Sequence, residues 1–363
     1  MLKNYCFDLE ETASRQLDEL VASDIFGSEQ IAIMPDAHTG AGCVIGFTAK
    51  VTDKVVPNLV GVDIGCGMLA QRLPAIEDKT ALCERIDVII RKAVPSGFAI
   101  HPQERTDSQQ HWGALLPEKL KCYEDLSNQS RYGKSVGTLG GGNHFIEINE
   151  DSQGELWLVV HSGSRNLGLQ VAEYYQRQAE ASCDELLPKD LRYLTGKLAE
   201  DYLHDMRLCQ EYAEANRREI ASAIAIGLRI DYLGHEIESV HNYIDHDGMI
   251  RKGACSAQEG QELIIPMNMA FGILRCVGKG NPEWNYSAPH GAGRRLSRSK
   301  AKKDLTMDAY EKSMGGVYST CVTKDTLDEA PMAYKPPDTI INAIGATVEI
   351  VDIWKPIYNY KAK

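Results

Sequence analysis

Apolar residues recur at helical spacing in three stretches of the chain. These stretches cover residues 75–94, 166–182 and 199–228, and the last is the longest. Apolar side chains that return every three or four positions fall on one face of a helix. The pattern therefore predicts three amphipathic helices.

The segments between clusters of glycine are typical of short strands. Residues 30–68 contain short apolar runs broken by glycines at positions 40, 42, 61, 65 and 67, and residues 156–161 form a continuous apolar run that ends in histidine. Bounded apolar runs of this length indicate strands. Residues 347–354 fit either a strand or a helix, and residues 291–303 indicate a basic helix. With no repeat or low-complexity linker, we predict a mixed α/β (α+β) fold in a single large domain over residues 1–363.

Composition limits the classes of function. The chain has 39 basic and 51 acidic side chains, a formal net charge of −12, so any contact with a polyanion must be confined to a local basic patch. No apolar run approaches the roughly 20 residues that span a bilayer. The amino terminus lacks the apolar core of a signal peptide, and no pair of cysteines has Cys-x-x-Cys spacing. We expect a cytoplasmic protein with reduced thiols and no membrane partner.

Five of the ten histidines lie in glycine-rich or polar turn sequences, where catalytic groups are often found. Each of them alone is also consistent with a hydrogen-bonded structural histidine. Asp63 and Cys66 stand three residues apart between glycines, which allow the sharp turn that would aim both at one point. A carboxylate, a thiolate and imidazoles together suit a divalent transition metal. The alternative is that Cys66 is a small buried hydrophobe. The five histidines are His38, His144, His161, His241 and His290.

Two further segments have the chemistry to bind phosphate. Residues 137–144 (Gly-Thr-Leu-Gly-Gly-Gly-Asn-His) present successive backbone N–H groups that can converge on an anion, although no P-loop lysine follows. The alternative is a plain glycine-rich turn. Residues 294–303 hold six cations in ten positions, directly after His290. This run is either a solvated helix face or a site for phosphate or the RNA backbone.

Taken in order, the motifs of the chain resemble those of the RtcB family of RNA-splicing ligases. The resemblance runs from about residue 35 to the carboxy terminus. The short length is similar to that of the branch coupled to release factor H. The motifs are Pro35-Asp-Ala-His, Val62-Asp-Ile-Gly-Cys-Gly, Gly137-Thr-Leu-Gly-Gly-Gly-Asn-His-Phe-Ile-Glu, His161-Ser-Gly-Ser-Arg, His241-Asn, Arg251-Lys-Gly-Ala and His290-Gly-Ala-Gly-Arg.

The resemblance implies a GTP- and manganese-dependent enzyme of RNA repair or tRNA splicing. It would join an RNA 3′-phosphate or 2′,3′-cyclic phosphate end to a 5′-hydroxyl end. His290 would be the nucleophile that takes GMP as a phosphoramidate. Whether a protein partner activates the chain stays open. Two Mn²⁺ ions would be bound by Asp63, Cys66, His144, His161 and His241, with Cys66 bridging both.

The same resemblance implies two further sets of residues. Phosphates of the RNA and the nucleotide would be bound by Arg165, Lys252, Arg294 and Arg298, the last two in an exposed cationic run. The nucleotide would be held by Asn143, His144, Phe145, Ile146, Glu147, His241, Asn242, Pro266, Met267, Asn268, Met269, His290, Gly291, Ala292, Gly293 and Lys361.

The chain departs from the family pattern beside the expected nucleotide pocket. Pro266-Met-Asn-Met-Ala replaces the usual Pro-Gly-Ser/Asp-Met-Gly, Ile273 takes the place of a serine that contacts the nucleotide, and Ala288-Pro-His replaces Cys-Ser-His. These changes leave the choice between GTP and ATP open. One alternative function is a metal-dependent RNA end phosphodiesterase without nucleotide transfer. Another is a non-catalytic module that binds RNA or metal.

Overall fold

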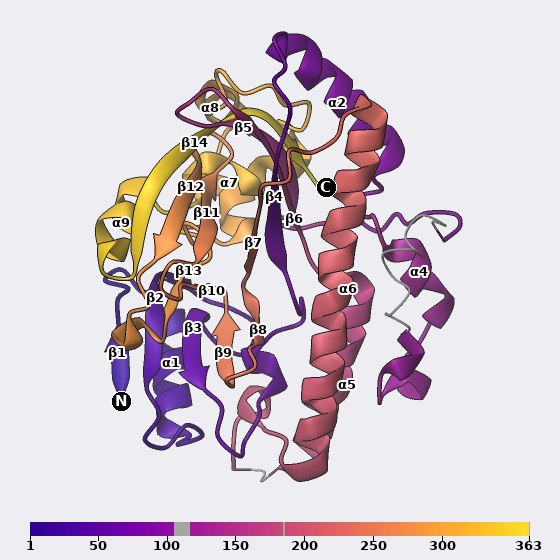
Figure 1. Ribbon diagram of the computed structural model, residues 1–363. Helices are drawn as coiled ribbons and strands as arrows, with labels where there is room; N and C mark the ends of the chain where they lie inside the picture. The colour runs from indigo at the N-terminus through magenta and orange to yellow at the C-terminus, as the bar shows by residue number, and fades with distance from the viewer. Residues whose placement is uncertain (105–116, 184–185, 363) are drawn as a thin grey trace.

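The computed structural model describes residues 1–104, 117–183 and 186–362, in which helices flank two large β-sheets (Figure 1). This arrangement confirms the predicted mixed α/β class. In the described part of the chain, no helix combines the length and the apolar character needed to cross a membrane.

One sheet has five strands and carries the N-terminal segment. Only β1 and β2 pair in parallel. The ladder between β2 and β3 is interrupted between Ile33 and His38, so residues 34–37 are free to contact other parts of the molecule. Helix α1 (Glu11–Ala22) contributes Ala13, Leu17 and Leu20 to the same core cluster as this sheet. The strand order is β1 (Leu2–Asn4), β2 (Ile31–His38), β3 (Ile45–Lys50), β9 (Met249–Lys252) and β8 (Asn242–Ile244).

The other large sheet has seven strands and is antiparallel at every pairing. Its longest strand, β14, includes residues 348–354, so the undecided segment is a strand. A separate pair consists of β10 (Ala254–Ser256) and β13 (Ser287–Pro289). The strand order of the large sheet is β11 (Glu262–Asn268), β12 (Gly272–Gly278), β14 (Val348–Lys361), β5 (Phe145–Glu150), β6 (Leu156–Ser162), β4 (Gly67–Arg72) and β7 (Glu236–Val240).

The three predicted amphipathic helices are confirmed as α2 (Lys79–Ala93), α5 (Arg165–Ser182) and α6 (Gly196–Leu228). Helix α6 runs along one side of the molecule and packs against α2, α5 and strand β6 (Figure 1). Shorter helices are α4 (Tyr132–Ser135), α7 (Arg298–Asp304), α8 (Met307–Ser313) and α9 (Pro337–Ala343).

The predicted basic helix over residues 291–303 is wrong in its first half. Helix α7 begins only at Arg298, where the Ser297 side chain accepts a hydrogen bond from the Lys300 N–H as an N-cap. Upstream, Gly293 has a φ of +73° and lies so close to Asp36 that a Cβ would overlap the Asp36 carbonyl. The chain therefore turns tightly here instead of starting a helix.

The two large sheets meet at His241. Strand β7 of the seven-stranded sheet ends at Val240, and strand β8 of the five-stranded sheet begins at Asn242. Because both sheets contribute to this junction, we propose that residues 1–363 form one domain.

Candidate functional site

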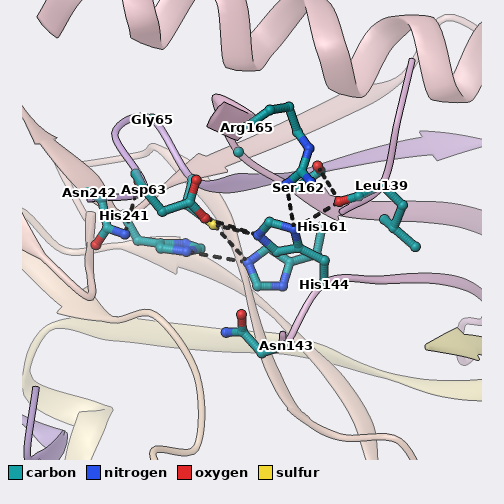
Figure 2. A network of polar contacts seen from close by, with 12 residues as sticks. Asp63, Gly65, Leu139, Asn143, His144, His161, Ser162, Arg165, His241 and Asn242 are labelled. Carbon is teal, nitrogen blue, oxygen red and sulfur yellow. Dashed lines mark hydrogen bonds and ion pairs between the residues drawn. The ribbon is translucent and has the colours of Figure 1, made fainter. Parts of the chain in front are cut away.

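Strand register brings the predicted metal ligands together. Gly67 pairs with both Ser162 and Val240, and Phe145 pairs with His161. Each of these paired positions lies beside or at a predicted ligand, because Cys66 precedes β4, His144 precedes β5 and His241 follows β7. The neighbouring ends of four strands therefore place side chains from distant parts of the sequence at one point (Figure 2).

The predicted ligands form two groups that share one sulfur atom. Cys66 Sγ lies 3.3 Å from His161 Nε2, which lies 3.4 Å from His241 Nε2. Cys66 Sγ also lies 3.5 Å from His144 Nε2, which lies 3.0 Å from Asp63 Oδ2. In each group all three ligand atoms lie within 4.8 Å of one another. The arrangement offers two sets of metal-ligand atoms with Cys66 in both.

Backbone contacts orient two of the ligands, His144 and Asp63, from behind. The His144 Nδ1–H donates to the Leu139 carbonyl at 2.8 Å, which leaves Nε2 pointing at Cys66 and Asp63. Fixing one ring nitrogen of a histidine in this way is how proteins present the other nitrogen to a metal. Asp63 packs against Gly163 so closely that any Cβ there would overlap its carboxylate.

The protonation states of the ligands follow from burial. Burial lowers the pKa of His161 and His241 well below the usual histidine range, so both imidazoles are neutral at pH 7. Burial, followed by the charge of Asp63, raises the pKa of the Cys66 thiol well above its usual value. Burial acts to raise the pKa of Asp63, but the hydrogen bonds from His144 and Cys66 and the charge of Arg165 together outweigh it and lower that pKa to about 2.

This donor set fits divalent transition metals. Neutral imidazole nitrogens, a carboxylate and a sulfur are the ligand types that such ions bind. Metal binding requires the deprotonated thiol. Burying the Cys66 thiolate costs free energy, and a cation beside the sulfur offsets this cost.

Two residues of α6 support the ligand segments, and sequence reasoning missed both. The Arg217 guanidinium is fully buried and donates to the Gly65 carbonyl at 2.8 Å and to the Ser162 carbonyl at 3.0 Å. Its Nη2 also bonds Glu238 at 2.6 Å. Asn216 Nδ2 donates to the Ser162 hydroxyl at 2.9 Å. Arg217 lies 152 positions from Gly65, and Asn216 lies 54 positions from Ser162. No local motif could therefore mark either residue.

A cavity of about 560 Å³ opens beside the two ligand groups, a size typical of small-molecule sites. Asp63, Cys66, His161 and His241 lie in its wall together with His290. The His290 and His241 rings are 4.9 Å apart between centroids. The predicted nucleophile and the predicted metal ligands therefore face the same space.

His290 is held in place by a buried carboxylate to which sequence reasoning assigned no role. His290 Nδ1 lies 2.6 Å from Asp36 Oδ2, and Asp36 is fully buried. An Nδ1–H donated to this carboxylate leaves Nε2 as the nitrogen with a free lone pair. Asp36 belongs to the Pro35-Asp-Ala-His motif, so this motif was the signal that could have identified it.

A buried lysine joins the two segments that carry Asp36 and His290. Lys335 Nζ donates to the Pro35 carbonyl at 3.1 Å, and the Lys335 N–H donates to the Gly293 carbonyl at 3.0 Å. Asp8 accepts from the same Nζ at 2.5 Å and compensates its charge. Lys335 is therefore a support for the His290–Asp36 pair.

Most of the predicted nucleotide-binding residues line the cavity. The exceptions are His144, which belongs to the ligand groups, and Ile146. Ile146 was wrongly predicted: side chains alternate along β5, so Phe145 and Glu147 face the cavity while Ile146 is buried in a core cluster. Ile273, expected at a serine position of the pocket, is likewise buried in the core with Trp354.

The four predicted phosphate-binding cations differ in their surroundings. Lys252 is buried at the cavity wall, where its Nζ donates to the carbonyls of Ala41 and Asn58 at 2.8 and 2.7 Å. Burial lowers its pKa. Arg165 does not line the cavity; its Nη1 lies 3.5 Å from His144 Nδ1 and its Nε donates to the Thr138 hydroxyl at 3.4 Å.

The prediction that Arg294 and Arg298 lie in an exposed cationic run holds for Arg298, whose side chain is 46% exposed, and is wrong for Arg294. The Arg294 side chain is only 15% exposed, and it pairs with buried Glu329 at 3.1 Å. Arg298 also pairs with Glu329, at 2.6 Å, and with Asp328 at 2.8 Å. A local run of cations could not reveal carboxylates that lie some 30 residues further along the chain. Both arginines line the cavity, but their charges are largely compensated.

Lys361 and Glu147 complete the far wall of the cavity. Lys361 Nζ lies 3.0 Å from Glu329 Oε2 and donates to the Asn143 carbonyl at 3.1 Å. Burial raises the pKa of Glu147 to about 7, although hydrogen bonds from Asn149 and Asn359 act in the opposite direction. Glu147 is therefore a buried carboxylate that titrates close to neutral pH.

The fold and the ligand set define a candidate two-metal centre beside a histidine-bearing cavity, and comparison with known proteins assigns the family. A family model described as tRNA-splicing ligase RtcB matches residues 19–362. The RNA-splicing ligase RtcB of Escherichia coli K12 is 33% identical over 89% of this chain and 88% of that protein. The tRNA-splicing ligase RtcB of Aeropyrum pernix is 28% identical, over 86% of this chain and 84% of that protein.

A third relative, the RNA-splicing ligase RtcB2 of another Escherichia coli strain, is 27% identical over 93% of this chain and 88% of that protein. The chain therefore belongs to the RtcB family of RNA-splicing ligases, which confirms the resemblance found in its motifs. Its placement in the branch coupled to release factor H stays a prediction.

Replacing Cys66 with serine tests the shared sulfur. Because Cys66 belongs to both ligand groups, we expect Cys66→Ser to lose both ions rather than one. Elemental analysis after manganese loading and desalting measures this directly. Cys83→Ser is the matched control, since this buried thiol lies on α2, outside the ligand groups, and donates to the Ile357 carbonyl. Two manganese ions per chain in Cys66→Ser would contradict the shared role.

Replacing Arg217 tests support from α6. Arg217→Met removes the donors to the carbonyls beside Cys66 and His161, so we expect metal affinity to fall by about ten- to a hundredfold. Isothermal titration with manganese, at a temperature where circular dichroism shows a folded variant, measures the change. Arg218→Met is the control, because Arg218, the residue next to Arg217, pairs with the surface carboxylates of Glu214 and Glu236. Equal affinities for both variants would remove Arg217 from this role.

Proposed function

We propose that this chain joins an RNA 3′-phosphate or 2′,3′-cyclic phosphate end to a 5′-hydroxyl end, using GTP and two manganese ions. The observation that carries the proposal is that His290, held by Asp36, shares one cavity with both ligand groups. Family membership supports the same activity. A cytoplasmic location and a role in RNA repair or tRNA splicing accompany the proposal as predictions.

The first step is nucleotidyl transfer to His290. Asp36 accepts the Nδ1–H and keeps the Nε2 lone pair directed into the cavity. Nε2 attacks the α-phosphorus of GTP, a P–N bond forms, and the bond to the leaving pyrophosphate breaks. The buried Asp36 carboxylate stabilises the positive charge that the ring gains during attack. Asp63, Cys66, His144, His161 and His241 would hold the manganese ions, which when bound neutralise charge on the triphosphate.

The later steps return His290 to its starting state. An oxygen of the RNA 3′-phosphate attacks the phosphorus on Nε2, the P–N bond breaks, and GMP passes to the RNA end. The 5′-hydroxyl then attacks the RNA phosphorus and GMP leaves. A cyclic phosphate must first be opened by water. Arg165 and Lys252 are the cations best placed to hold the RNA phosphates, because neither forms a side-chain hydrogen bond with a carboxylate of the residues that the structure describes.

Glu147 gives a physical basis for choosing guanine. Guanine presents two adjacent N–H donors on one edge, which an ionised carboxylate accepts, whereas adenine presents one donor beside one acceptor. Asn149 and Asn359 each donate to a Glu147 oxygen and thereby fix the carboxylate at the cavity wall. Met267 and Met269 line the same cavity and add no charged group to it.

Loss of the nucleophile tests the proposal. Incubation with manganese and labelled GTP should give a covalent adduct that His290→Ala abolishes. Asp36→Asn should slow adduct formation by about a hundredfold, since the ring loses its charged acceptor. His235→Ala is the control, because that ring pairs with Glu262 at the surface. If cyclic phosphate ends are opened while neither GTP nor ATP gives an adduct, the chain is a phosphodiesterase instead.

The pKa of Glu147 predicts how nucleotide selectivity depends on pH. The carboxylate is ionised above a pKa of about 7 and protonated below it. Recognition of guanine is thus present at pH 8 and lost as pH falls through 7, so we expect KM for GTP to rise about tenfold between pH 8 and pH 6. KM for ATP, measured in the same adduct assay, should not rise. Parallel profiles for the two nucleotides would show that Glu147 does not contact the base.

A further inference from the structure

Phe98 is fully exposed, which is unusual for a phenylalanine in a well-supported turn. It lies just after α2, in the turn formed by residues 96–99, where the Ala99 N–H donates to the Ser96 carbonyl at 3.2 Å. Gly97, with a φ of +63°, provides the left-handed residue of this turn. The ring therefore projects into solvent from a defined backbone.

The turn is fixed on both sides to the glycine-rich segment that carries His144. Leu139 donates to the Pro95 carbonyl at 2.9 Å, and the Gly97 N–H donates to the Gly140 carbonyl at 2.7 Å. After the turn, the His101 N–H donates to the Lys134 carbonyl at 3.0 Å. Leu139 also accepts the His144 ring N–H, so one residue joins the Phe98 turn to a predicted metal ligand.

Arg165 lies between this turn and the ligand groups. Its guanidinium packs against Gly140, where any Cβ would overlap it, and Gly140 pairs with Ser96 beside Phe98. On its other side, Arg165 contacts the His144 ring at 3.5 Å. Among the described residues its hydrogen-bond neighbours include no carboxylate, so the guanidinium can still pair with a phosphate, although its charge also lowers the pKa of Asp63 (Figure 2).

We propose that Phe98 is a stacking platform for a base of an unpaired RNA end, while Arg165 binds a neighbouring phosphate. This inference rests on the proposed function, because it names the part of the RNA that the ligase would hold outside the cavity. An exposed aromatic ring beside a cation is the combination that single-stranded nucleic acids bind, with the ring facing a base and the cation facing the backbone. A paired end would keep its bases stacked inside the helix and could not use the ring in this way.

Binding of a single-stranded oligoribonucleotide that ends in a 3′-phosphate tests the proposal. The oligonucleotide carries 2-aminopurine near its 3′ end, so stacking quenches its fluorescence without any chemistry. We expect Phe98→Ala to weaken binding by about tenfold and to lose the quenching. Phe98→Trp should keep both, whereas Phe98→Leu should behave like the alanine variant because an aliphatic side chain cannot stack.

Phe7→Ala is the matched control, since Phe7 is the other strongly exposed phenylalanine among the described residues, at 93% exposed. Equal binding by Phe98→Ala and the wild-type chain would overturn the proposal, as would equal behaviour of the leucine and tryptophan variants. The proposal would also be overturned if the wild-type chain formed a dimer that only Phe98→Ala dissociates, while RNA binding stayed unchanged. Adduct formation by the wild-type chain reports separately on the proposed function. Stacking without an adduct would support the role of Phe98 and contradict the proposed ligase activity.

Discussion

The site depends on three buried imidazoles, a buried thiol and a partly exposed carboxylate that lie within a few ångströms of one another. Polar groups placed out of water are costly unless each has a partner. The strand ends supply the geometry, and backbone carbonyls fix the orientation, most clearly where Leu139 holds His144. The Nε2 atoms of His161 and His241 converge with the sulfur of Cys66, while their Nδ1 atoms have no hydrogen-bond partner among the described residues. Neutral, converging donors of this kind favour a cation at their centre.

Two separate buried cations support the metal-ligand groups and the predicted nucleophile. Behind the ligand groups, Arg217 of α6 ties together the carbonyls beside Cys66 and His161. On the other side, Lys335 ties the segment of Asp36 to that of His290. Both supports are buried cations that donate to backbone carbonyls while a carboxylate, Glu238 or Asp8, compensates their charge. The metal-binding half and the nucleophile can therefore be perturbed separately.

Much of the fold and site followed from the sequence, and the parts that did not have physical reasons. The long helices were predictable because an apolar stripe is a local pattern, and the metal ligands because they stand in glycine-rich motifs. The orientation of Ile146 was missed although strand alternation would have excluded it from the cavity. The pairing of Arg294 with Glu329 and the role of Arg217 could not be predicted, since each depends on partners distant in sequence. Charge along a segment does not reveal which opposite charge folds against it.

The position of β14 has a consequence for how the protein reaches its folded state. This strand comes late in the chain, yet it lies between β12 and β5 in the middle of the seven-stranded sheet. Until it inserts, β5 has an unpaired edge beside His144, and Lys361 is absent from the cavity wall. Such long-range pairing is slow and exposes strand edges to other chains. Newly made chains would therefore be most prone to aggregation just before synthesis reaches this strand, and would bind nucleotide only after it.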